Sequence, residues 1–461
     1  MSFGEGRNGT EAIPYRVFLY LRRTDGKEFE ARSVQVDGAE TALSPQAART
    51  SQHGFLPLEL PLPKAWEYGS FHHLAVTTAD GHTAAAVVRG RDSFFSLGMW
   101  GYRNHGNSLE ERTRDTCAAF RDFLFNTHMG MSGGQKKHLL SPEGLKMLDE
   151  MGLRFMADAP DKETARKPQL YARFLLDEPD AHEYAVNNLP ADRRLGAYAQ
   201  GIVQRQREWT EKDPRTLCLL NVDLTYKPEN WLVYGQLPDI MALDPYYQSL
   251  LRDAYWRHPG RLAAFCHPLF VFAASEVARW ASEPHPMHVI LNSVSVREEA
   301  RSFRYGTPEE KRIEFYYALA AGAKGISYWW FTPYGPHRGC GAIEPDAHKM
   351  MQELARLNAE ARALEPLLAL SCPAAISGSK TDPFVSALPV WLMARTLFVG
   401  TDTALIILVN RDHLSDRVGT LYQPIPKARV TFKPPPWLKP SAAFRLSSGN
   451  IEPVQFAPQG E

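Results

Sequence analysis

Short apolar runs alternate with longer amphipathic stretches over the middle of the chain. Such runs, bounded by polar segments, are typical of buried strands, and their alternation with helical patterns predicts a parallel sheet. Eight runs of five to seven residues are the expected strands: 94–100, 124–128, 153–157, 171–176, 217–222, 239–243, 288–292 and 325–330. Eight strand–helix repeats indicate a (β/α)8 TIM barrel.

Helix signals support this pattern. Thr307-Pro-Glu-Glu310 combines a capping box with proline at the first helical position, and Gly322 is a stop signal. A last amphipathic helix is expected over about 346–364. Only the segment 161–170, between the third and fourth strands, has no room for more than a short helix.

The two ends of the chain have a different, β-like pattern. Short alternating pieces separated by the turn signals Asp25-Gly26 and Asp80-Gly81 precede the barrel. Apolar strand patterns return after it, at 390–394 and 404–410. The predicted fold class is therefore α/β, a (β/α)8 TIM barrel flanked by N-terminal and C-terminal β-sandwiches, with the domains at 1–92, 93–370 and 371–461.

Composition excludes several classes of partner. With 461 residues, 44% hydrophobic and 23% charged, the chain is ordinary for a globular protein. Its formal net charge is zero, so the chain has no excess of positive charge that would indicate binding to nucleic acid or to an anionic membrane. No apolar run approaches the roughly 18 residues that a membrane span needs. The sequence carries no sign of an oligomeric state.

Cysteines and glycines give no cofactor signal. The five cysteines are scattered without zinc-ligand spacing, so neither a structural metal nor a disulfide framework is expected. Met131-Ser-Gly-Gly134 lacks the spacing of a phosphate loop. No cofactor is therefore predicted. The polar start lacks the apolar core of a signal peptide, which leaves the compartment open: secreted or periplasmic if a leader was removed, and otherwise cytoplasmic.

The strand ends carry the candidate chemistry. The run 171–176 ends in Asp177 and Glu178, and Pro179 stops the strand there. In a (β/α)8 barrel the carboxyl ends of the strands form the mouth of the active site. The other polar and aromatic residues at strand ends are Trp100, Tyr102, Asn126, His128, Asp158, Asp223, Asp244, Tyr246, Asn292, Trp329 and Trp330. Hydrogen-bonding groups beside exposed rings suit a carbohydrate.

Several of these residues also have purely structural interpretations. Asp177 or Asp244 could cap a following helix, and His128 could be a structural hydrogen-bonding group. Trp329 and Trp330 are neighbours on one strand, so they should point in opposite directions and one should pack in the core. Glu178 is not needed for capping, which favours a functional role for it.

Three segments resemble a known family. Phe174-Leu-Leu-Asp-Glu-Pro-Asp180, the segment 238–247 and the segment 317–329 are similar to parts of (β/α)8 glycoside hydrolases, in the same order. In that family a glutamate that ends strand four is commonly the acid/base, which implies this role for Glu178. Many members place a nucleophilic glutamate at the end of strand seven, where this chain has Asn292, and Glu298 and Glu299 come later.

The resemblance leaves three mechanisms open. In the first, Glu178 is the general acid and Asp244 the nucleophile or base. In the second, Asp177 steers a 2-acetamido group of the substrate while Glu178 protonates the leaving oxygen. In the third, Asp177 is the nucleophile and Asp244 the acid, as in barrels similar to α-galactosidases.

Two other classes compete with a glycoside hydrolase. The absence of a strand-seven acid favours a non-catalytic carbohydrate-binding pseudoenzyme on the same scaffold. A metal-dependent hydrolase is the third class, but strand one has no His-x-His and no obvious ligand set occurs, so no metal is predicted. The expected partner is a plant, algal or microbial glycan or oligosaccharide, whose sugar and linkage no motif defines.

Overall fold

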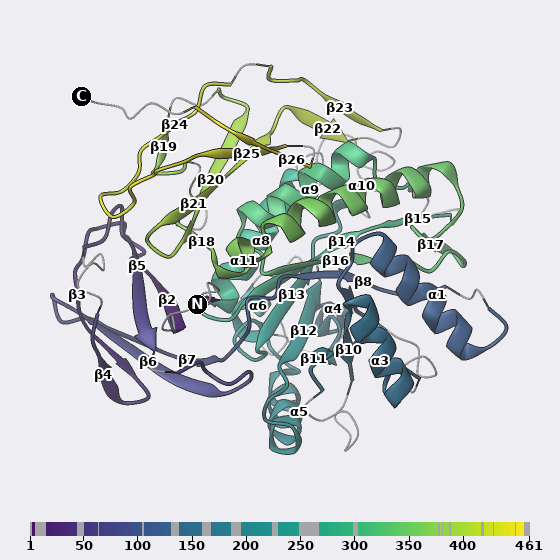
Figure 1. Ribbon diagram of the computed structural model, residues 1–461, viewed down its shortest axis with the longest axis horizontal. Coiled ribbons are helices and arrows are strands. Elements are labelled where there is room, and N and C mark those ends of the chain that lie inside the picture. Colours follow the sequence, from purple (N-terminus) through teal and green to yellow (C-terminus); the bar gives the residue numbers. More distant parts are fainter. Residues whose placement is uncertain are drawn as a thin grey trace.

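The centre of the protein is a closed barrel of eight parallel strands (Figure 1). The computed structural model describes residues 2–4, 15–43, 50–62, 64–103, 106–130, 138–158, 167–185, 195–223, 229–248, 267–297, 303–376, 379, 381–386, 389–415, 419–426, 428–447 and 449–455. In barrel order the strands are β8 (Ser96–Met99), β9 (Thr127–His128), β10 (Arg154–Ala157), β11 (Leu170–Leu176), β12 (Cys218–Asp223), β13 (Ile240–Asp244), β14 (Met287–Asn292) and β16 (Gly325–Trp329). All eight expected strands are present in chain order, so the predicted barrel is confirmed.

Strand β9 is much shorter than the predicted run 124–128. Leu124 has a φ angle of 62°, so the chain is still turning after the preceding helix at that point. Only two residues then pair with the neighbouring strands before the chain leaves the barrel.

Helices cover the outside of the barrel. They are α1 (Leu109–Asp122), α3 (Pro142–Met151), α4 (Pro179–Ala185), α5 (Ala199–Lys212), α6 (Glu229–Tyr234), α8 (Leu269–Ser282), α9 (Pro308–Ala320), α10 (Pro345–Ala363) and α11 (Glu365–Leu370). Helix α9 begins with the predicted capping box, in which the Thr307 hydroxyl accepts from the Glu310 amide. The segment 161–170 lies largely outside the described residues.

Side chains alternate between the two faces of the barrel wall. In β12, Leu219 packs inside the barrel with Ala242 of β13, whereas Leu220 and Leu243 face the helices. Successive strand residues point to opposite faces. This alternation decides which strand-end residues face the barrel axis.

Seven strands before the barrel form a two-layer β-sandwich. One sheet consists of β1 (Ser2–Gly4), β2 (Tyr15–Arg22) and β5 (Phe55–Leu62), and the other of β4 (Ala39–Thr41), β3 (Ala31–Val36), β6 (Phe71–Thr78) and β7 (Thr83–Arg89). Leu58 of one sheet and Val76 of the other lie in one buried cluster. Positive φ angles at Gly26 and Gly81 mark the two predicted turns.

After the barrel the chain forms small antiparallel sheets, drawn in yellow-green at the top of Figure 1. Their strands are β18 (Cys372–Pro373), β20 (Leu392–Val399), β21 (Thr403–Asn410), β19 (Val385–Ser386), β24 (Thr431–Phe432), β22 (His413–Ser415), β23 (Thr420–Tyr422), β25 (Phe444–Ser447) and β26 (Asn450–Pro453). Strands β20 and β21 pack against α9 through Leu397 and Ile407, which join the main core. The ring of Phe398 stacks on Phe55 of the N-terminal sandwich at 5.6 Å, so the two flanking parts touch.

The divisions expected at residues 92 and 370 stay a prediction. In the structure β7 ends at Arg89 before β8, and α11 ends at Leu370. No helix within the described residues is long and apolar enough to cross a membrane.

Candidate active site at the carboxyl ends of the barrel strands

Acidic and amide side chains of β12 and β13 meet inside the barrel mouth. Asn221 and Asp223 share the inner face of β12 with Leu219, and Asp244 follows Ala242 on the inner face of β13. Asp223 and Asp244 are paired residues in the strand register. The carboxyl ends of these two strands therefore place both acids at the mouth.

Asp177 and Glu178 lie in the turn between β11 and α4. Glu178 has a φ angle of 42°, in the left-handed region, and its backbone N–H donates to the Asn221 carbonyl at 3.0 Å. The Asp177 side chain is exposed, while that of Glu178 is half-buried. The two adjacent carboxyls therefore have different surroundings.

Asn221 connects the acids of the mouth. Its Nδ2 donates to Asp177 Oδ1 at 3.0 Å and to Asp244 Oδ2 at 3.2 Å. One amide therefore fixes the spacing of two carboxylates that come from different strands.

Glu178, Asp223 and Asp244 form a compact carboxyl cluster, with one oxygen of each within 4.8 Å of the others. Burial raises the pKa of Asp244 well above its ordinary value, and the charges of Glu178 and Asp223 raise it further. Burial also raises the pKa of Glu178, as does the charge of Asp177, whereas a hydrogen bond with Asp244 lowers it. Asp244 is 2% exposed, so its carboxyl is far more buried than that of Glu178. Both carboxyls therefore keep their protons to a higher pH than an exposed acid does.

The same three carboxyls could hold a cation. Carboxylate oxygens are the ligands that Ca²⁺ and Mg²⁺ prefer, and Asp244 Oδ1 is buried without a hydrogen-bond partner among the described residues. Sequence reasoning missed this possible ligand set because its members come from three separate strand ends with no characteristic spacing.

Asp180 is a positioning residue that sequence reasoning missed. Its buried carboxylate accepts from the backbone N–H of Asp223 and from the indole of Trp231, both at 3.0 Å. Burial raises its pKa to about 6. The available signal was its place directly after Asp177-Glu178-Pro179, in the first turn of α4.

Three aromatic rings stack in succession, beginning with Tyr246 beside the carboxyl cluster. Tyr246 stacks on Trp329 with 5.9 Å between ring centroids, and Trp329 stacks on Trp330 at 5.4 Å. The pKa of Tyr246 is raised by burial and next by the charges of Asp244 and Glu178, which places the phenol beside the acids. The prediction that Trp329 and Trp330 point in opposite directions is wrong. The rings of the two residues stack on each other instead of lying on opposite faces of the strand.

Trp100 and Tyr102 lie on the connection that follows β8. The Trp100 indole donates to Ser327 Oγ at 3.1 Å and meets Phe174 edge-on inside the barrel. Tyr102 is half-buried, and its backbone N–H donates to Thr332 Oγ1 at 3.1 Å. Both lie at the carboxyl end of the barrel, and Trp100 is held by a polar contact of its own.

Four further predicted residues are not brought into the carboxyl cluster. Asn126 donates to the Phe95 carbonyl and accepts from the Leu97 amide, which ties it to the backbone beside β8. His128 packs on Phe120 of α1, outside the barrel, because Met129 takes the inner position of that strand. The Asn292 amide oxygen accepts from the Val294 backbone at 3.1 Å. Asp158 is exposed just beyond β10. Glu298 and Glu299 lie outside the described residues.

The strand order and the site together define a (β/α)8-barrel protein with a carboxyl cluster at the mouth. No protein-family model and no curated protein match the chain. Among solved structures it is similar to a β-galactosidase from the Antarctic haloarchaeon Halorubrum lacusprofundi, at 15% identity, 58% coverage of each chain and a TM-score of 0.42. It is also similar to a β-galactosidase from the psychrophilic Marinomonas ef1, at 12% identity, over 62% of this chain and 63% of that one, with a TM-score of 0.46.

A third similar structure is a β-glucuronidase from Bacteroides uniformis, at 11% identity and a TM-score of 0.38, covering 91% of this chain and 56% of that one. The chain thus spans between 56% and 63% of the length of these three proteins. The barrel fold itself is established by the closed ring of eight parallel strands.

Proposed function

We propose that the protein hydrolyses a glycosidic bond, with Glu178 as the general acid. The observation that supports this most is the half-buried Glu178 carboxyl, whose pKa is raised and which lies within 4.8 Å of Asp223 and Asp244. A carboxyl with a raised pKa keeps its proton to a higher pH and can protonate the oxygen of a leaving sugar. The stacked rings of Tyr246 and Trp329 offer apolar faces beside it.

The second catalytic group distinguishes the three mechanisms. Asp244 is almost fully buried and its raised pKa favours the neutral form, which argues against an ionised nucleophile at this position. Asp177 is exposed directly beside Glu178. These observations favour the mechanism in which the 2-acetamido oxygen of the substrate attacks the anomeric carbon. Asp177 then accepts the acetamido N–H, Glu178 protonates the departing oxygen, and water opens the cyclic intermediate.

A comparison of two substrates tests that choice. A 4-nitrophenyl 2-acetamido-2-deoxy glycoside should be hydrolysed, while the same sugar with a 2-hydroxyl group should not. Asp177→Asn should then reduce turnover of the acetamido substrate. Equal turnover of both substrates by the wild type would overturn the assisted mechanism and leave a protein nucleophile.

The role of Glu178 is tested by comparing the hydrolysis of substrates with different leaving groups by Glu178→Gln and by wild type. Loss of a general acid should slow hydrolysis of an alkyl glycoside by about 10²–10⁴-fold, and that of a 2,4-dinitrophenyl glycoside far less, because a good leaving group needs little protonation. Glu143→Gln, a change of an exposed acid of α3, is the matched control. Equal losses with both leaving groups would contradict the assignment.

The same substrates and variants also distinguish a glycoside hydrolase from the two alternative classes of protein. Glycan binding by wild type and Glu178→Gln with turnover by neither would favour a carbohydrate-binding pseudoenzyme. Loss of activity on chelation that added Ca²⁺ restores would favour a metal-dependent hydrolase that uses the carboxyl cluster.

A further inference from the structure

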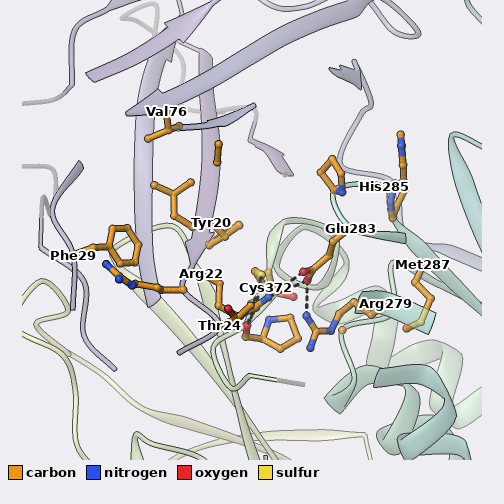
Figure 2. A pocket seen from close by; sticks show the side chains of 18 of the residues that line it. Tyr20, Arg22, Thr24, Phe29, Val76, Arg279, Glu283, His285, Met287 and Cys372 are labelled. Carbon is orange, nitrogen blue, oxygen red and sulfur yellow. Dashed lines mark hydrogen bonds and ion pairs between the residues drawn. The ribbon is translucent and has the colours of Figure 1, made fainter. Parts of the chain in front are cut away.

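A cavity lies at the amino ends of the barrel strands, away from the carboxyl cluster, and Figure 2 shows its lining. It measures about 650 Å³ and lies between the N-terminal sandwich and the amino ends of β14 and β16. Residues 20–25 of the sandwich form one wall, and residues 283–287 with 371–373 form the opposite one. Its size is within the roughly 300–1,000 Å³ of small-molecule pockets.

The cavity has an excess of positive charge. Its lining includes five cationic side chains, Arg22, Arg23, Arg91, Arg279 and Lys324, and two acids, Asp25 and Glu283. Asp25 pairs with Arg23 at the exposed edge. Figure 2 shows Arg22 and Arg279 converging on Glu283. The Glu283 carboxylate therefore forms ion pairs with two guanidinium groups. The side chains of Arg22 and Arg279 are only 13% and 5% exposed.

The other two cations have no carboxylate partner among the described residues. Lys324 donates only to neutral oxygens, those of the Leu368 and Ser371 carbonyls and of the Ser371 hydroxyl. Arg91 has no hydrogen-bond or ion-pair partner in the described part of the chain. Burial lowers the pKa of Lys324 to about 7 and also lowers that of Arg91. Both side chains are half-buried, and partly desolvated cations of this kind are stabilised when an anion enters.

The remaining lining is largely apolar. Its apolar and aromatic side chains include those of Tyr20, Leu21, Phe29, Val76, Pro284 and Met287. An inorganic ion alone would leave these surfaces uncovered, whereas a molecule with an apolar body would bury them.

We propose that this cavity binds a small organic anion, with its acidic group between Arg22, Arg91 and Lys324 and its apolar body against the sandwich wall. The site is independent of the carboxyl cluster, whose negative charge repels the same ligand. Binding here joins the N-terminal sandwich to the barrel, so the ligand raises the unfolding temperature of the whole protein.

A pair of fluorescent probes tests the proposal. The anion 1-anilinonaphthalene-8-sulfonate should bind with one-to-one stoichiometry, and its neutral analogue N-phenyl-1-naphthylamine at least about tenfold more weakly. Arg91→Met removes one charged contact and should weaken binding of the anion by about tenfold or more, without changing that of the neutral probe. Lys349→Met, an exposed cation of α10 outside the cavity lining, should change neither.

Equal affinity for the two probes, or unchanged binding of the anion by Arg91→Met, would overturn the proposal. If circular dichroism shows that Arg91→Met does not fold, Lys324→Met takes its place with the same expectation.

Cys372 reports where the probe binds. Its half-buried thiol lines the cavity, and Arg22 Nη2 lies 3.7 Å from its sulfur. The bound anion should slow modification of Cys372 by N-ethylmaleimide, followed by peptide mass spectrometry, in wild type and not in Arg91→Met. Modification at the same rate with and without the anion would place its binding elsewhere and refute the site.

Discussion

Replacing Asp244 by asparagine is expected to make the stability of the protein less dependent on pH. The Asp244 carboxyl is 2% exposed, and burial with the charges of Glu178 and Asp223 raises its pKa well above 3.8. Asparagine keeps an oxygen that can accept from Asn221, which now donates to Asp244 at 3.2 Å. It also offers an N–H toward Glu178, so the geometry should persist while the titration is removed.

The sign follows from proton binding. Between the pKa of the unfolded chain and the higher folded pKa, the folded state holds a proton that the unfolded state has released. The wild-type free energy of unfolding therefore falls as pH rises through this window, by roughly 1–2 kcal/mol per pH unit for this one group. Over this window the variant should gain stability relative to wild type as the pH rises, and the gain should level off once the pH passes the folded pKa.

Urea unfolding followed by tryptophan fluorescence at several pH values measures this difference. Asp346→Asn, which changes a side chain that is 76% exposed, is the matched control. Its free energy of unfolding should depend on pH in the same way as that of wild type. Parallel curves for Asp244→Asn and wild type would show that Asp244 is ionised in the folded protein. Abolished turnover in a well-folded Asp244→Asn would in addition restore this residue as the nucleophile.

Two further predictions concern the barrel wall and the aromatic rings. Arg173→Met should destabilise the protein by about 3–5 kcal/mol in urea unfolding, because it leaves Asp213, now paired at 2.9 Å and fully buried, without its partner; a loss below about 1 kcal/mol would contradict the reasoning. Trp329→Ala removes the ring between Tyr246 and Trp330 and should raise KM for an oligosaccharide by about tenfold with little change in melting temperature. A large drop in melting temperature at unchanged KM would make Trp329 a core residue.

The chain's local patterns were enough to predict the barrel. Eight apolar runs separated by helical stretches specify strands and helices through periodicity, and Thr307 with Glu310 marks the start of α9 within four residues. The strand end at Leu176 likewise follows from Asp177, Glu178 and Pro179 alone. These features depend only on neighbours in sequence, so no tertiary information was needed to find them.

The face of the barrel wall to which each side chain points was harder to predict. A shift of the strand register by one residue moves every side chain to the opposite face. His128 was expected at the mouth, yet Met129 takes the inner position and His128 contacts Phe120 outside the barrel. Similarly, Trp329 and Trp330 do not alternate, because their rings stack on each other.

Only the tertiary structure decided which groups share an environment. Glu178, Asp223 and Asp244 end three different strands, and barrel closure brings their oxygens within 4.8 Å, which raises the pKa of Glu178 and of Asp244. The basic cavity joins Arg22 to Cys372, which are 350 residues apart. No spacing in the chain encodes such a contact, because it depends on how the sandwich packs on the barrel.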